Sequence, residues 1–448
     1  MKKVNKTLGL ILVLSLIFSI AMVLVACDSD KAIEELNATT DLTKQQEELK
    51  TKVDGLEKQS GENASAVDGI ASQLDALGAQ IAELQKTIEE ANAQPEESAL
   101  AFDYGEECYE KIQYIDKVLH DRDCYSGENY KLAEKWILWN LYEAGYSEEE
   151  AFLSPFTITS YSKEDELADN FSAVKAYELA DDKHYKRSGR RYVEDAEGAF
   201  VKVNVTMNNI VAVKKGKVDE QIIVGAHFDG TGTGDNGSGV ALNLTTAQHI
   251  YDVETYYTIV FVFFNAEEIG CYGSTAYANA MTDEEVAKTK YMINMDSLVC
   301  GDYCNLYGGV QDDETQTVKD TEAYDNAMKV AESLGLTFYT NPWTYENPAP
   351  GYENPDYASP STGDWSDHVG FKKKGIKYLY FEATNWFIPG PYNEYDGYGE
   401  TYLIGMLMNT ENDYLEYIET YFPGRIQSHI KKFSALLNAL LMQGELDF

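Results

Sequence analysis

Basic residues are scarce in this sequence of 448 amino acids. Lysine and arginine together number 36 against 75 acidic residues, so the formal net charge is −39. Each phosphate contact needs a cation, and this balance therefore disfavours binding to nucleic acid or to an anionic membrane surface. Few bidentate clamps for substrate carboxylates are available, which disfavours strongly acidic substrates. The arginines are Arg122, Arg187, Arg190, Arg191 and Arg425.

Cysteine is also rare, with six residues in the whole chain. Cys27 apart, an odd number remains, so at least one thiol is unpaired within a monomer. Cys300 and Cys304 have a spacing that zinc sites use, but no second pair completes a set of four ligands. Packing roles or a local disulfide are therefore favoured over a structural zinc site. The cysteines beyond Cys27 are Cys108, Cys124, Cys271, Cys300 and Cys304.

The first 26 residues are typical of an export signal. Three lysines within the first six residues precede an apolar run from Leu8 to Ala26. The run ends in Leu24-Val25-Ala26-Cys27, which resembles the bacterial lipoprotein signal, where the chain is cut before the cysteine and the cysteine carries lipid. An uncleaved transmembrane anchor is the alternative. Because polar sequence begins directly after Cys27, we expect a lipid anchor there, on the extracellular face of a bacterial cell membrane.

Residues 27–98 are expected to form a stalk and linker. Between Leu42 and Ile88, seam positions recur at alternating spacings of four and three, as in a coiled coil. Ser60 and Asn63 weaken the middle of this seam. The pattern predicts a helix that forms a homo-oligomer through residues 42–88, the alternative being a lone polar-faced helix. Gln94-Pro95-Glu96 then supplies a hinge.

From Ala99 to Phe448 strand and helix signals alternate, which predicts one α/β catalytic domain. We expect a three-layer sandwich in which helices flank a central mixed, mostly parallel β-sheet. Apolar spacing predicts helices over 108–119 and 132–141. The apolar segments 210–213 and 222–224 are expected to be neighbouring strands of that sheet.

Side chains able to bind metal follow several of the expected strands. The strand 221–226 ends at His227, and Asp229 can hydrogen-bond the other nitrogen of the histidine ring. A glycine-rich stretch, residues 230–239, then turns sharply and presents Asp235 before a helix over 240–250. A phosphate-binding loop is the alternative, but it lacks a lysine partner.

Two adjacent glutamates end the most apolar strand, residues 257–264. Glu267 and Glu268 are costly there unless each has a partner or a role, because an unpaired buried charge is strongly unfavourable. Neighbouring residues do not normally point at one atom, so one glutamate is expected to be a ligand and the other a base. Asp296 follows the strand 291–295, and His368 precedes a strand over 378–381.

These blocks resemble the successive motifs of the dinuclear zinc exopeptidase family. That family includes bacterial secreted aminopeptidases, glutamate carboxypeptidase II and, as a divergent branch, glutaminyl cyclases. The likeness spans residues 99–441. The blocks are His227-x-Asp229, Gly234-Asp235-Asn236-Gly237-Ser238-Gly239, Asn265-Ala266-Glu267-Glu268-Ile269-Gly270, Asn294-Met295-Asp296 and Ser366-Asp367-His368.

The resemblance implies two zinc ions per chain. Asp235 would bridge them, with His227 and Asp296 on one ion and Glu268 and His368 on the other. Glu267 would be the general base, which takes a proton from a water that bridges the metals. Asp229 would support His227, so Glu267 and Asp229 are the expected catalytic residues. The family also tends to have a cis peptide directly after the bridging aspartate.

The chain departs from the family late in the domain, where a histidine-threonine-aspartate segment is common. Asn409-Thr410-Glu411-Asn412-Asp413 occupies the comparable place. Among possible activities, the acidic balance favours an aminopeptidase, whose substrates carry an α-ammonium group. A carboxypeptidase, a glutaminyl-cyclase-like enzyme and a non-catalytic peptidase-like binding protein are the alternatives. The expected partners are a peptide substrate and the membrane, through the lipid on Cys27.

Overall fold

A computed structural model describes residues 104–124, 129–163, 200–349, 353–388 and 399–448. Residues 422–424 apart, these belong to one unit that comprises Leu100–Tyr421 and Arg425–Phe448. The expected signal peptide, the lipidation site at Cys27 and the stalk lie outside the described residues and stay predictions. Within the described ranges, no helix combines the length and the apolar character needed to cross a membrane.

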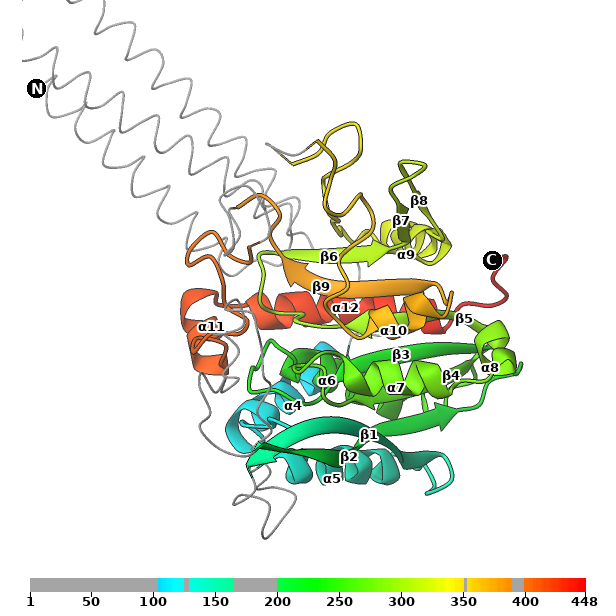
Figure 1. The fold of residues 1–448 in the computed structure, drawn as a ribbon, viewed down its shortest axis with the longest axis vertical. Helices are drawn as coiled ribbons and strands as arrows, with labels where there is room; N and C mark the ends of the chain where they lie inside the picture. The colour runs from blue at the N-terminus through cyan, green and yellow to red at the C-terminus, as the bar shows by residue number, and fades with distance from the viewer. Residues whose placement is uncertain (1–103, 125–128, 164–199, 350–352, 389–398) are drawn as a thin grey trace, which may run out of the picture. The chain divides into compact units, whose positions relative to one another are not determined.

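The unit is organised around a seven-stranded sheet in the order β1-β2-β4-β3-β5-β9-β6. Figure 1 shows β1 and β2 at one edge of this sheet and β6 at the other. A short hairpin of β7 and β8 lies apart from it. The strands are β1 (Ala151–Lys163), β2 (Phe200–Lys214), β3 (Gln221–His227), β4 (Thr258–Phe264), β5 (Thr289–Met295), β6 (Tyr303–Gly308), β7 (Val310–Asp312), β8 (Thr317–Lys319) and β9 (Tyr378–Thr384).

The four central strands, β4, β3, β5 and β9, are parallel, and the strands outside them are antiparallel to their neighbours. The mixed sheet expected from the sequence is therefore confirmed. One expected pairing is wrong. The segments 210–213 and 222–224 belong to β2 and β3, and β4 lies between these strands, hydrogen-bonded to both. The two segments were expected to be neighbours because they lie close together in the sequence, but β4, which is buried along its whole length, inserts between them.

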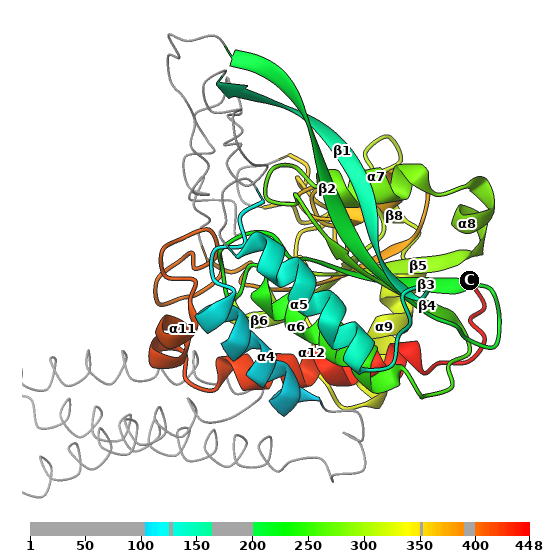
Figure 2. The same cartoon turned by 90° about the horizontal axis from the view of Figure 1, so that it is seen from below.

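Helices cover both faces of the sheet, and this gives the three layers expected from the sequence. Figure 2 shows α4, α5, α6 and α12 on one side of the sheet and α7 and α8 on the other. Each side has its own apolar core, and the larger one lies under α4, α5, α6, α9 and α12. The helices are α4 (Gly105–Val118), α5 (Tyr130–Glu143), α6 (Gly237–Ile250), α7 (Tyr272–Ala280), α8 (Asp283–Lys288), α9 (Glu322–Ser333), α10 (His368–Lys373), α11 (Leu415–Tyr421) and α12 (Arg425–Leu441).

The helices predicted over 108–119, 132–141 and 240–250 are present as α4, α5 and α6. Helix α6 begins three residues earlier than predicted because Asn236 caps it. The Asn236 side chain accepts a hydrogen bond from the Gly239 backbone N–H at 2.9 Å, which satisfies a donor that the helix itself leaves unpaired.

The five cysteines within the described residues form no disulfide, and all of them are buried. The local disulfide considered for Cys300 and Cys304 is not formed. Both side chains are inaccessible to solvent within the larger core. They pack as small apolar groups, as free cysteines commonly do.

Candidate metal centre

The candidate site lies where three parallel strands end. Strands β4, β3 and β5 are hydrogen-bonded neighbours that run in the same direction, so their carboxyl ends meet at one edge of the sheet. His227 is the last residue of β3, Asp296 directly follows β5, and Glu267 follows β4 after two residues. Open α/β sheets form ligand sites at this edge. Residues far apart in the sequence therefore converge at this edge.

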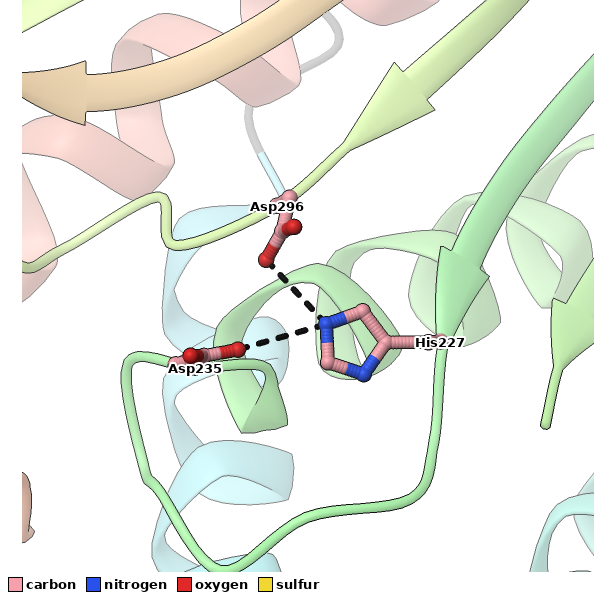
Figure 3. Close-up of side chains that lie close together, drawn as sticks. All are labelled: His227, Asp235 and Asp296. Carbon is pink, nitrogen blue, oxygen red and sulfur yellow. Dashed lines mark hydrogen bonds and ion pairs between the residues drawn. The ribbon is translucent and has the colours of Figure 1, made fainter. Parts of the chain in front are cut away.

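Three of the predicted ligands lie together at this edge (Figure 3). Nε2 of His227 is 3.2 Å from Oδ1 of Asp235 and 3.3 Å from Oδ1 of Asp296. One ligand atom from each residue lies within 4.8 Å of the others, and all three residues are buried. One imidazole nitrogen and two carboxylate oxygens are ligand types that zinc accepts in catalytic sites. The chemistry and the spacing of this group fit a single zinc ion.

The charges around His227 favour a cation. Burial by itself would lower the pKa of His227, but the carboxylates of Asp296 and Glu267 outweigh it and raise that pKa well above its ordinary value. Burial raises the pKa of Asp235, and the nearby Asp296 carboxylate adds to this. A positive charge between these groups relieves the repulsion between the carboxylates. The electrostatics of the group therefore agree with its donor set.

Asp229 contacts the site in a way that the sequence did not indicate. Its carboxylate is 3.7 Å from Nδ1 of His227, whereas its own backbone carbonyl is nearer, at 3.3 Å. The carboxylate instead accepts hydrogen bonds from the backbone N–H groups of Glu267 at 3.1 Å and Glu268 at 3.3 Å. Asp229 thus ties the end of β3 to the segment that carries both glutamates.

The two glutamates point to different places. Oε2 of Glu267 is 3.7 Å from Nε2 of His227, beside the three-residue group. Glu268 lies against Gly230, where an added Cβ would come within 2.6 Å of its Oε1. Gly230 has φ +105°, so both the backbone conformation and the space favour glycine. Burial raises the pKa of Glu267 well above its ordinary value, as is common for a catalytic base.

The loop that presents Asp235 is held by Asp413, a residue to which the sequence gave no role. The peptide bond between Asp235 and Asn236 is cis, as the family resemblance predicts. The Asp413 carboxylate accepts hydrogen bonds from the N–H groups of Gly234 at 2.7 Å and Asp235 at 2.9 Å. Asp413 belongs to the late segment that departs from the family, and the aspartate there was the only signal in the sequence.

A buried arginine supports the other side of the same loop. Arg122 donates hydrogen bonds to the backbone carbonyl groups of Leu119 at 3.1 Å, Phe228 at 3.0 Å and Gly232 at 2.8 Å. Burial lowers the pKa of Arg122, and the Asp413 carboxylate opposes this. Arg122 therefore joins the C-terminal end of helix α4 to the loop that presents Asp235.

Replacing Asp413 with alanine is expected to weaken zinc binding about 10–100-fold, the usual effect of losing an outer partner of a metal ligand. The change leaves two buried N–H groups unpaired, which costs about 1–3 kcal/mol for each. Zinc affinity from competition with a chromogenic chelator, together with the thermal unfolding midpoint, measures both effects. Asp413→Asn keeps one acceptor oxygen, so its zinc affinity and its unfolding midpoint should lie between those of the wild type and the alanine variant. Wild-type zinc affinity in the alanine variant would contradict a supporting role.

Asp296 is fixed by a chain of two hydrogen bonds. Ser366 Oγ donates to Asp296 Oδ2 at 2.7 Å, and Asn294 Nδ2 donates to Ser366 Oγ at 2.7 Å. Burial acts to raise the pKa of Asp296, but His227 first and the hydrogen bond from Ser366 after it keep that pKa below its ordinary value. Ser366 was noted in the sequence only as part of a motif. Its contact with a ligand carboxylate is visible only in the folded chain.

His368 does not join the three-residue group. Its ring contacts Tyr378 in a tilted arrangement, with ring centroids 4.6 Å apart, and stacks on Tyr380 at 5.1 Å. Neither ring nitrogen makes a hydrogen bond of good geometry with the described residues. Burial lowers the pKa of His368 to about 3, so the ring is neutral, the form that binds metals. The chemistry of this histidine fits a ligand, whereas its position lies outside the group.

Comparisons with known proteins find a matching family model and similar proteins. Residues 209–402 match the model of Peptidase family M28. The chain is 32% identical over 201 residues to the alkaline phosphatase isozyme conversion protein of Escherichia coli, a match that covers 41% of this chain and 54% of that protein. It is 29% identical over 182 residues to aminopeptidase YwaD of Bacillus subtilis, covering 39% of this chain and 35% of that protein. The chain thus spans about half the length of these curated relatives, or less.

A solved structure shares the fold over a longer range. BSAP, a zinc aminopeptidase from Bacillus subtilis, superposes with a TM-score of 0.51 at 17% identity, over 77% of this chain and 96% of that chain. At this identity the likeness concerns the fold alone. The family resemblance inferred from the sequence is confirmed by the match to the family, and the α/β fold by this structure.

Proposed function

We propose that this chain, whose residues 209–402 match the model of Peptidase family M28, is a zinc-dependent aminopeptidase. The proposal rests above all on one observation. His227, Asp235 and Asp296 converge at the end of three parallel strands, with Oε2 of Glu267 beside them. Peptide hydrolysis by a metallopeptidase needs such a ligand group and a free carboxylate at its side.

Each residue of the site has a role in this proposal. His227, Asp235 and Asp296 hold the metal, which when bound supplies Lewis-acid activation of water and of the scissile carbonyl group. Glu267 accepts a proton from the attacking water and returns it to the departing amine. Asp229 positions Glu267 by accepting its backbone N–H.

The arginines in the described residues support cleavage at the N-terminal end of the peptide over cleavage at its C-terminal end. A carboxypeptidase needs a cation for the substrate's α-carboxylate, and arginine is well suited to that task. Both arginines in the described parts of the chain are already engaged. Arg122 binds three backbone carbonyl groups, and Arg425 donates to Asp302 and to the carbonyl of Cys300. The acidic surroundings instead favour an α-ammonium group.

Peptides with free and acetylated N-termini test the proposal. The zinc-loaded protein is expected to release the first residue of free peptides and to leave acetylated ones intact, as followed by mass spectrometry. Cleavage of acetylated peptides from the C-terminus would instead establish a carboxypeptidase. Loss of ammonia from an N-terminal glutamine would establish a cyclase, and peptide binding without turnover would establish a non-catalytic role.

We also propose two zinc ions per chain, with Asp235 and Glu268 contributing to the second. His368 is the histidine that the sequence offers for it, and its neutral ring with unbonded nitrogens supports this choice. The variant His368→Ala is therefore expected to bind one zinc ion where the wild type binds two, as measured by mass spectrometry of the metal. His249→Ala is the matched control, because His249 lies at the opposite end of α6 from Asp235. Unchanged zinc content in His368→Ala would show that the ring only packs against tyrosines.

The expected tether completes the proposal. Lipid on Cys27 would hold the peptidase at the extracellular face of a bacterial membrane, and residues 42–88 would join copies of the chain. Cys27→Ser in the full-length protein is expected to move it from the membrane fraction to the supernatant. Retention of this variant in the membrane would favour an uncleaved apolar anchor.

A further inference from the structure

A cysteine thiol lies against the proposed base. Cys271 follows Glu267 by four residues and precedes helix α7, with a left-handed backbone conformation, φ +53°. Its backbone N–H donates a hydrogen bond to the Glu267 carbonyl at 2.9 Å, which closes one turn of chain between them. This turn places the Cys271 thiol 3.4 Å from Oε1 of Glu267, within hydrogen-bonding distance for sulfur.

The two oxygens of the Glu267 carboxylate have different surroundings. Oε2 lies 3.7 Å from Nε2 of His227, on the side of the three-residue group. Oε1, the other oxygen of the carboxylate, accepts a hydrogen bond from the Cys271 thiol. A donor on one oxygen restricts rotation of the carboxylate about its last side-chain bond, which is otherwise a broad torsion. The other oxygen is thereby kept facing the position of the attacking water.

The thiol is suited to remain a donor. Cys271 is only 6% exposed, and burial together with the nearby Glu267 charge raises its pKa well above the ordinary value for a thiol. It therefore keeps its proton next to the carboxylate. A buried thiol is a weak hydrogen-bond donor, so it can orient a base without binding it as tightly as a cationic partner would.

We propose that Cys271 is a positioning residue for catalysis. Its S–H group orients the carboxylate of Glu267 toward the group formed by His227, Asp235 and Asp296. The kinetic consequence rests on the proposed peptidase function. The orientation itself does not, because it concerns only the contact between two side chains of this chain.

Kinetics of the zinc-loaded full-length protein on a chromogenic leucine anilide test the consequence. Cys271→Ala is expected to lower kcat about tenfold with little change in KM or zinc content, because a misoriented base slows the chemical step and not binding. Cys271→Ser retains a donor and is expected to recover most of that loss. Cys108→Ala removes another buried thiol, on the buried face of α4, and should leave kcat unchanged. A kcat for Cys271→Ala within twofold of wild type, or a loss that serine does not recover, would overturn the proposal.

Infrared spectroscopy tests the orientation without any turnover. The S–H stretching band lies in a region almost free of other protein bands, and its frequency falls when the thiol donates to a carboxylate. The Cys271 band is identified by its absence in Cys271→Ser, and Glu267→Ala is expected to shift it to higher frequency. A band unmoved by Glu267→Ala would refute the contact. If the band shifts while the wild type hydrolyses no peptide, the peptidase function fails and the contact stands.

Discussion

Replacing Glu267 with glutamine is expected to lower kcat by about 10²–10⁴-fold while zinc stays bound. Glutamine keeps the size of the side chain but cannot accept a proton from water. Glu267 Oε2 faces His227 without belonging to the group of His227, Asp235 and Asp296, so the metal keeps these ligands. Steady-state kinetics on an unblocked peptide and zinc per chain, measured on the same sample, separate the two effects.

An exposed glutamate provides the control for this substitution. Glu284 lies in the first turn of α8, where it is exposed to solvent. Glu284→Gln removes the same charge from the protein and should leave kcat and zinc content at wild-type values. Substantial turnover in Glu267→Gln would show that another group is the base, and loss of zinc from that variant would make Glu267 a ligand.

Changing Asp235 to asparagine is expected to remove metal binding together with activity. Its carboxylate lies 3.2 Å from the ring nitrogen of His227, and the resemblance makes it the ligand shared by both ions. A neutral amide is a much poorer zinc ligand, so we expect affinity to fall by more than the roughly 10–100-fold typical of losing an outer partner. Zinc should raise the unfolding midpoint of the wild type, because a ligand that binds only the folded state stabilises it. The variant should lose that shift.

Asp252→Asn tests whether loss of any carboxylate has the same effect. Asp252 is exposed just after α6, and its substitution should preserve both the zinc-dependent shift and turnover. If Asp235→Asn binds zinc as tightly as the wild type, the metal lies elsewhere and the three-residue group is not the metal centre.

The sequence predicted the architecture well because its apolar patterns were strong. Strand β4 is a nearly continuous apolar run and is buried along its whole length, and β3 and β5, which lead to His227 and Asp296, are also mostly buried. The error in the predicted fold concerned which strands are neighbours in the sheet. The closeness of β2 and β3 in the sequence suggested that they are neighbours, but which strands pair depends on how well each fills the centre of the sheet, and this is not a local property.

The site could be predicted only in part for a similar reason. The ligand types were readable because His227 and Asp296 stand at the ends of strands and Asp235 lies in the glycine-rich loop after one of them. Nothing local indicated that Asp413 holds the Asp235 loop or that Ser366 binds Asp296, since these contacts join segments far apart in the chain.

The sequence by itself determined the layered α/β class, the resemblance to a peptidase family and the ligand types available to the site, because apolar periodicity and side-chain type are local properties. Only the tertiary structure decided which residues meet. It gathered His227, Asp235 and Asp296, placed the His368 ring against two tyrosines, and set the Cys271 thiol against Glu267. Packing and the direction of parallel strands fix these distances, and neither is written in any one segment of the chain.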